Sequence, residues 1–176
     1  MFTEEQIEEF MLGCISLALK HDSGIHKPFV GAIVLDKNKK LAGIGTKKFI
    51  PGTKLYTHAE RNALYDAKER AKRGTLVSTL EPCVIVSKRS QILDPCATLI
   101  VNSGIENVII GLRDSGGNID GKGIAYLEEH GVEVQIYSGY LYQQLTRLLF
   151  DQRDKKKTRP VRNGSIRSQR IKVFIL

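Results

Sequence analysis

Tryptophan is absent from this chain of 176 residues, and methionine, cysteine and proline are scarce, with two, three and five residues respectively. A small and odd number of cysteines excludes a disulfide-rich secreted scaffold and indicates a reducing compartment. No stretch approaches about 18 consecutive apolar residues, which excludes a membrane-spanning helix. The chain begins MFTEEQIEE, which is acidic where a secretory signal would be basic. We therefore expect a cytoplasmic protein that does not bind a membrane.

Hydrophobic residues make up 41% of the chain and charged residues 26%, which is typical of a globular domain. The net charge of +8 is concentrated at one end. Residues 151–176 contain nine Lys or Arg and two Asp, whereas residues 1–150 contain 18 basic and 17 acidic side chains. The sequence therefore predicts one domain over residues 1–150 and a basic C-terminal extension over residues 151–176. Such a run is usually a solvated end and favours a nucleic-acid partner only weakly.

The spacing of apolar residues predicts alternating helices and strands. Thr3 and Gln6 fit a capping box at the start of the first helix. Helices are predicted over residues 3–20, 58–72, 95–103, 121–130 and 140–150, and strands over residues 29–35, 41–45, 75–80, 108–112 and 132–136. This order predicts an α/β fold with three layers, α/β/α, around a five-stranded mixed sheet.

One histidine and two cysteines lie close to the ends of these elements. His58 begins the second helix, Cys83 follows the third strand, and Cys96 lies at the start of the next helix. This donor set fits a tetrahedral Zn²⁺ site with its fourth position open for water. A proline precedes each cysteine, and because proline is favoured at the first position of a helix, each thiolate is expected at a helix N-terminus.

Glu60 lies two residues after His58, on the same first turn of the predicted helix. From there its carboxylate can face a water at the metal, take a proton from it and return the proton to a leaving amine. The alternative interpretation is a closed structural zinc site in a non-catalytic binding module. Glu60 distinguishes the two interpretations. A catalytic zinc site needs a carboxylate to transfer protons, whereas a structural zinc site does not.

The remaining candidate side chains receive other interpretations. Cys14 lies in the apolar stripe of the first helix and is expected in the core. Glu81 is expected to be structural, because a carboxylate would repel thiolates at a zinc ion. Arg61 and Asn62 receive no assignment. The other histidines lie in or near loops and are not expected to bind the metal; they are His21, His26 and His130.

The sequence His58-Ala59-Glu60, followed by Pro-Cys and a second Cys, resembles the zinc-dependent nucleobase deaminases of the cytidine and deoxycytidylate deaminase superfamily. The resemblance covers about residues 5–150 and implies the cytidine-deaminase-like fold. Twelve residues, Val84 to Pro95, separate the two cysteines. A gap of this length ending in Pro-Cys is most similar to the deaminase domain of the bifunctional riboflavin-biosynthesis deaminase–reductase, as is the stretch Thr79–Cys83.

The resemblance implies a zinc-dependent hydrolytic deaminase that converts an exocyclic amine of a pyrimidine-type ring to a carbonyl and releases ammonia. The implied substrate is a small phosphorylated aminopyrimidine or a pyrimidine nucleotide, and the implied assembly is a homo-oligomer. Lys27, Lys88 and Arg89 are the candidate substrate contacts. The alternative enzyme deaminates cytosine or adenine in single-stranded DNA or RNA, with residues 151–176 anchoring the phosphates.

Overall fold

The computed structural model describes residues 2–20, 28–53, 55–84, 93–114 and 121–150. A mixed five-stranded sheet runs through the molecule in the order β2-β1-β5-β6-β7. β1 pairs antiparallel with β2 and β5, whereas β5, β6 and β7 are mutually parallel. Its strands are β1 (Gly31–Leu35), β2 (Leu41–Thr46), β5 (Thr75–Leu80), β6 (Asn107–Leu112) and β7 (Glu133–Ile136). The predicted three-layer α/β fold and its mixed sheet are confirmed.

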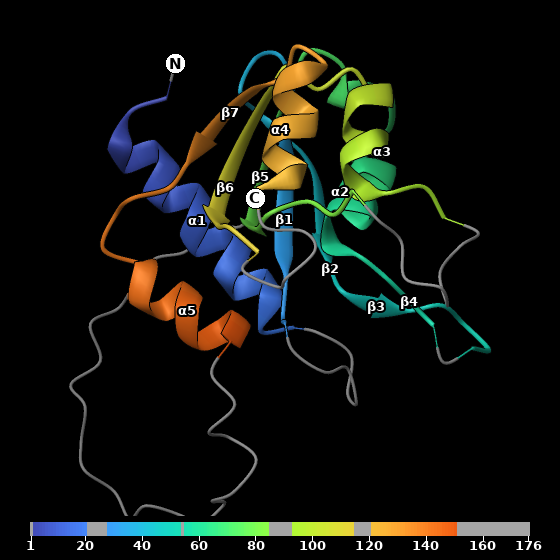
Figure 1. Ribbon diagram of the computed structural model, residues 1–176, viewed down its shortest axis with the longest axis horizontal. Helices are drawn as coiled ribbons and strands as arrows, with labels where there is room; N and C mark the ends of the chain where they lie inside the picture. Colours follow the sequence, from blue (N-terminus) through green and yellow to red (C-terminus); the bar gives the residue numbers. More distant parts are fainter. Residues whose placement is uncertain (1, 21–27, 54, 85–92, 115–120, 151–176) are drawn as a thin grey trace, which may run out of the picture.

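Helices cover both faces of the sheet (Figure 1). α1 and α5 pack on one face, and α2, α3 and α4 lie on the other. The helices are α1 (Glu4–Ala18), α2 (Ala59–Ala67), α3 (Cys96–Asn102), α4 (Lys122–Glu129) and α5 (Tyr142–Phe150). The capping box of Thr3 and Gln6 is present at the start of α1. Among the described residues, no helix is long and apolar enough to cross a membrane.

Two features differ from the sequence prediction. The helix expected over residues 58–72 is divided, because Lys68 has a φ of 52° and a 3₁₀ helix, η1 (Lys68–Ala71), follows α2. The loop between β2 and α2 contains a two-stranded ribbon of β3 (Lys48–Phe49) and β4 (Tyr56–Thr57). Strands of two residues have no measurable apolar periodicity, so pattern analysis does not detect them.

Two glycines of β2 bring α2 unusually close to the sheet. A Cβ at Gly43 would overlap the Ala63 carbonyl, and one at Gly45 would overlap the Ala59 carbonyl. Ala59, Ala63 and Ala67 are fully or almost fully buried on the facing side of α2. Small residues on both elements therefore fix the first turn of α2 against the end of β2.

The outer edge of β2 is covered by side chains from the same helical segment. Asn62 donates to the Thr46 carbonyl over 2.7 Å, Asp66 accepts from the Ile44 N–H over 2.9 Å, and Arg70 donates to the Ala42 carbonyl. These side chains recur every four residues and so follow the strand along one side of the helix. The Asn62 and Asp66 bonds add to the glycine contacts that hold α2 in place, whereas the Arg70 bond holds η1 beside the strand.

Candidate active site

His58, Cys83 and Cys96 converge beside the carboxyl end of β5. The Nδ1 atom of His58 lies 3.5 Å from the Sγ atom of each cysteine. All three potential ligand atoms lie within 4.8 Å of one another. Two sulfur donors and one imidazole nitrogen at this spacing fit a Zn²⁺ ion with one coordination position left over. We call these three side chains the donor cluster.

The backbone around the donor cluster explains how the three side chains meet. His58 is the N-cap residue of α2 and makes no side-chain capping bond, so its ring is available to the cluster. Cys96 is the first residue of α3; its N–H donates to the Cys83 sulfur over 3.4 Å, and the Ala97 N–H donates to the Cys83 carbonyl over 3.0 Å. The prediction that each thiolate lies at a helix N-terminus is confirmed, although Cys83 itself lies in an irregular segment after β5 and meets the start of α3 and not a helix of its own. The start of α3 nevertheless supplies N–H groups to Cys83.

The two thiols have opposite acidities. Hydrogen bonding with Cys96, aided by His58, lowers the pKa of Cys83 to about 4 against the opposing effect of burial. The hydrogen bond with Cys83, followed by burial, raises the pKa of Cys96 well above its ordinary value. Burial lowers the pKa of His58, but Cys83 and Glu60 outweigh burial and raise it overall. Both the start of α3 and His58 thus favour the thiolate form of Cys83, which is the form that binds a metal.

Glu60 lies in the first turn of α2 and is only 3% exposed. The Ser78 hydroxyl donates to its Oε1 atom over 3.5 Å. Burial raises the pKa of the Glu60 carboxyl to about 7, against the opposing charge of His58. A carboxyl in this range can both accept and donate a proton near neutral pH.

Lys47 and Tyr56 lie beside His58, and the sequence did not predict either of them as a site residue. The Tyr56 ring is stacked on the His58 ring, with 5.9 Å between their centroids, and the Nζ of Lys47 lies 4.1 Å from the centroid of Tyr56. Lys47 is 5% exposed, and burial lowers its pKa although the charge of Glu60 raises it. The alternation Gly43-x-Gly45-x-Lys47, which continues one residue past the end of β2, is the sequence signal for this position.

Glu81 has the structural role that the sequence predicted. Its carboxylate is 3% exposed. It accepts hydrogen bonds from the backbone N–H groups of Asp114, Gly121, Gly123 and Ile124. These donors surround the beginning of α4, so Glu81 joins the end of β5 to that helix and does not belong to the donor cluster.

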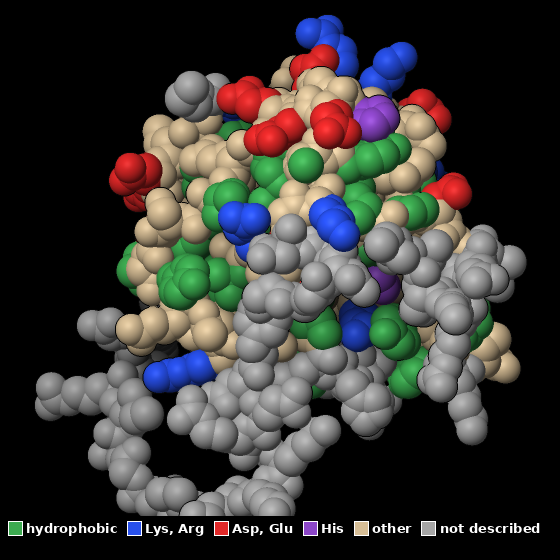
Figure 2. Space-filling view, in the orientation of Figure 1, with side chains coloured by type: hydrophobic (Ala, Val, Ile, Leu, Met, Phe, Trp, Pro, Cys, Tyr) green, Lys and Arg blue, Asp and Glu red, His purple; other side chains and the backbone are tan. Residues whose placement is uncertain are grey.

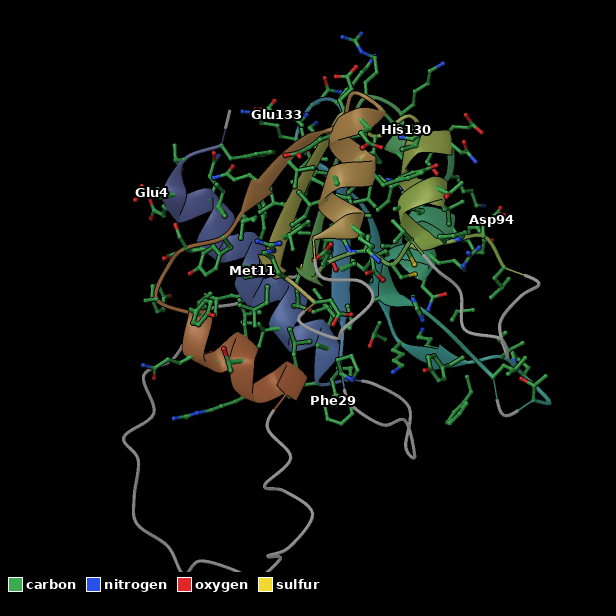
Figure 3. All side chains as sticks on the ribbon, viewed as in Figure 1. Glu4, Met11, Phe29, Asp94, His130 and Glu133 are labelled. Carbon is green, nitrogen blue, oxygen red and sulfur yellow. The ribbon has the colours of Figure 1, made fainter. Side chains whose placement is uncertain are left out.

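Arg61 and Asn62, which received no assignment from the sequence, both have defined partners. The Arg61 guanidinium donates to the Tyr65 hydroxyl over 2.8 Å and to the Asp94 carbonyl. Asp94 lies just before α3 (Figure 3). Asn62 donates to the edge of β2, as described above.

The other predicted positions fall into two groups. Cys14 is fully buried in the core and donates to the Val77 carbonyl over 3.4 Å, as expected, and burial raises the pKa of its thiol. His130 lies at the end of α4, stacked on Tyr126, and is not part of the donor cluster (Figure 3). The remaining candidates lie outside the described residues: Lys27, Lys88, Arg89, His21, His26 and the extension 151–176.

Known proteins resemble this chain over the region that contains the donor cluster. Residues 4–112 match the family model of the cytidine and deoxycytidylate deaminase zinc-binding region. The chain is 41% identical over 109 residues to a diaminohydroxyphosphoribosylamino-pyrimidine deaminase of Buchnera aphidicola subsp. Schizaphis graminum, covering 62% of this chain and 68% of that protein. It is 37% identical over 142 residues to riboflavin biosynthesis protein RibD of Bacillus amyloliquefaciens, covering 80% of this chain and 35% of that protein.

A solved structure shows the same relationship. The bifunctional diaminohydroxyphosphoribosylaminopyrimidine deaminase/reductase of Thermotoga maritima matches with a TM-score of 0.66 and 33% identity, covering 83% of this chain and 40% of that one. The chain thus spans only about a third of the RibD protein to which it is similar. It belongs to the cytidine and deoxycytidylate deaminase family and is a zinc-dependent deaminase, as the sequence predicted.

Proposed function

We propose that this chain hydrolytically deaminates a phosphoribosylated diaminopyrimidine, with His58, Cys83 and Cys96 as zinc ligands and Glu60 as the proton carrier. The observation that carries the proposal is the donor cluster, whose ligand atoms lie within 4.8 Å of one another, with a buried carboxyl two residues from His58. The names of the relatives described above supply the substrate class.

The roles of the residues follow from their chemistry. When bound, zinc supplies Lewis-acid activation of water. The Glu60 carboxylate takes one proton from water and passes it to a ring nitrogen; it then takes the second proton from the oxygen newly bonded to the ring carbon and passes it to the amine, which leaves as ammonia while the carbonyl forms. The Ser78 hydroxyl holds Oε1 during both transfers. Because Glu60 is buried beside Lys47 and His58, its proton exchanges with the substrate and not with bulk solvent.

The charge distribution agrees with a phosphorylated substrate. Figure 2 shows acidic side chains gathered on one part of this face. Glu128 and Glu129, the last residues of α4, are exposed. Glu81 follows β5 directly, two residues before Cys83 of the donor cluster, and it binds the N-terminal end of α4. The donor cluster therefore lies toward the end of α4 opposite to Glu128 and Glu129. Lys47 is a buried cation at the site. Lys27, Lys88 and Arg89 remain predicted substrate contacts. We propose a cytoplasmic location on the basis of the cysteine usage of the chain, and a homo-oligomer on the basis of the family resemblance alone.

The test is ammonia release by the zinc-loaded protein from a matched set of substrates. We expect release from diaminohydroxyphosphoribosylaminopyrimidine and less from its dephosphorylated form. Cytidine, dCMP and single-stranded DNA serve as competing substrates. Release from dCMP or DNA, with none from the diaminopyrimidine, would reject the proposed substrate while retaining the deaminase chemistry.

A further inference from the structure

Arg61 is a buried cation that the deaminase chemistry leaves without a role. It is 4% exposed, and arginine is almost never buried to this extent without specific partners. Its guanidinium donates to the Tyr65 hydroxyl and to the Asp94 carbonyl, and it lies 5.7 Å from the centroid of the Tyr65 ring. Arg61 follows Glu60 directly, so it joins the first turn of α2 to a segment 33 residues further along the chain.

The Asp94 carbonyl lies two residues before Cys96. Twelve residues separate Cys83 from Cys96, so the covalent chain alone does not fix the distance between the two sulfurs. The Ala97 N–H bond to the Cys83 carbonyl holds α3 on one side of Cys96. The Arg61 bond to the Asp94 carbonyl holds the other side. The backbone is therefore fixed by a long-range hydrogen bond on each side of Cys96, at Asp94 and at Ala97.

We propose that Arg61 is a positioning residue for Cys96: by holding the Asp94 carbonyl against the first turn of α2, it keeps the Cys96 thiol within reach of His58 and Cys83. This proposal rests on the zinc ligands proposed above. Residues that orient metal ligands contribute to metal affinity, and their loss typically weakens it about 10-fold to 100-fold. The guanidinium also adds positive charge beside a donor cluster that contains two thiols.

The planar fork of arginine suits this role better than a lysine would. Two separate N–H groups, on Nη1 and Nη2, reach the Tyr65 hydroxyl and the Asp94 carbonyl. Lysine presents a single ammonium on a flexible stem and does not reproduce this geometry. Arg61→Lys should therefore weaken zinc binding less than Arg61→Ala, but measurably.

Arg70 provides a matched control on the same helical segment. It also donates to a distant backbone carbonyl, that of Ala42, but at the outer edge of β2. If contacts of this kind only stabilise the fold, Arg61→Ala and Arg70→Ala should lower the melting temperature and leave zinc affinity unchanged in both. If Arg61 positions Cys96, zinc affinity should fall in Arg61→Ala and stay unchanged in Arg70→Ala.

The experiment measures zinc affinity by chelator competition and the thiolate-to-cobalt absorption of the Co²⁺-substituted protein. We expect Arg61→Ala to weaken zinc binding at least about 10-fold and to alter the cobalt spectrum, while Arg70→Ala changes neither. Unchanged affinity and spectrum in Arg61→Ala would overturn the proposal. If Arg61→Ala does not fold, zinc affinity and the cobalt spectrum are measured instead in Arg61→Lys and in Tyr65→Phe, which removes one hydrogen-bond partner of Arg61. Smaller changes in the same direction are expected.

Cys96→Ser separates this proposal from the proposed function. Retained stoichiometric zinc in Cys96→Ser would reject the ligand assignment itself. Loss of zinc in Cys96→Ser, together with wild-type zinc affinity in Arg61→Ala, would reject only the role of Arg61.

Discussion

Glu60 is deeply buried and lies two residues after His58 of the donor cluster, and these two features lead to a prediction about its charge. Glu60→Gln preserves the volume of the side chain and removes its ability to carry a proton. We expect this variant to keep its zinc and its melting temperature, because Glu60 is not among the proposed ligands. Its turnover should fall at least about 10²-fold, the usual scale for a lost general acid–base.

Glu69→Gln is the matched control, because Glu69 is an exposed glutamate on the adjoining η1. Steady-state ammonia release and metal content, measured on both variants, distinguish the roles. Turnover close to that of the wild type in Glu60→Gln would show that another group moves the proton.

At the level of single residues, the sequence predicted the role of a side chain where its residue type has one common role in a site of this kind, as Cys and His have in zinc binding. The Cys and His positions and the structural role of Glu81 could be predicted for this reason. Arg61 and Lys47 could not, because their roles depend on partners brought close only by the fold. The contact between Arg61 and Asp94 joins positions 33 residues apart, and no local pattern reports such a distance.

At the level of elements, the packing of α2 on β2 positions both His58 and Glu60. A Cβ at Gly45 would overlap the Ala59 carbonyl, and Ala59 lies between those two residues. We expect Gly45→Ala to displace the first turn of α2, to cost about 1–3 kcal/mol of unfolding free energy as overpacking does, and to reduce both zinc content and turnover.

Gly13→Ala is the control for this substitution. Gly13 lies within α1, where an added Cβ meets nothing within 4 Å. Alanine there should be neutral or stabilise the helix by about 0.5–1 kcal/mol. Denaturant unfolding of both variants tests the prediction, and Gly45→Ala as stable as the wild type would contradict the proposed steric role of the glycine.

The regular elements themselves were predictable. β1, β5 and β6 have largely apolar runs that the sheet buries, and α1 has its capping box. The break after α2 was not predictable, because the sequence KERA of η1 has ordinary helix formers and Lys68 adopts its left-handed conformation only in the folded chain. The β3–β4 ribbon depends likewise on tertiary contacts, among them the stacking of Tyr56 on His58.

At the level of the whole molecule, the basic extension of residues 151–176 contains none of the described site residues. His58, Glu60, Cys83 and Cys96 all lie within residues 1–150, whose charges nearly balance. We expect a chain ending at Phe150 to keep its zinc and its turnover of the diaminopyrimidine nucleotide.

Binding of single-stranded DNA at several salt concentrations tests the alternative role of residues 151–176. Phosphate contacts would give affinity that falls steeply with salt in the full chain and is lost in the shortened one. Salt-dependent deamination of DNA by the full chain alone would contradict the prediction and favour a nucleic-acid substrate.

The covered edge of β2 has a consequence for the behaviour of this protein at high concentration. An open edge strand is a template on which other chains can extend a sheet, and natural proteins block such edges against aggregation. Here the backbone groups of Ala42, Ile44 and Thr46 are already bonded by side chains of the adjoining helical segment. Copies of this chain that associate therefore cannot extend the sheet through these backbone groups of β2, and the side chains that bond them protect this edge from amyloid-like growth.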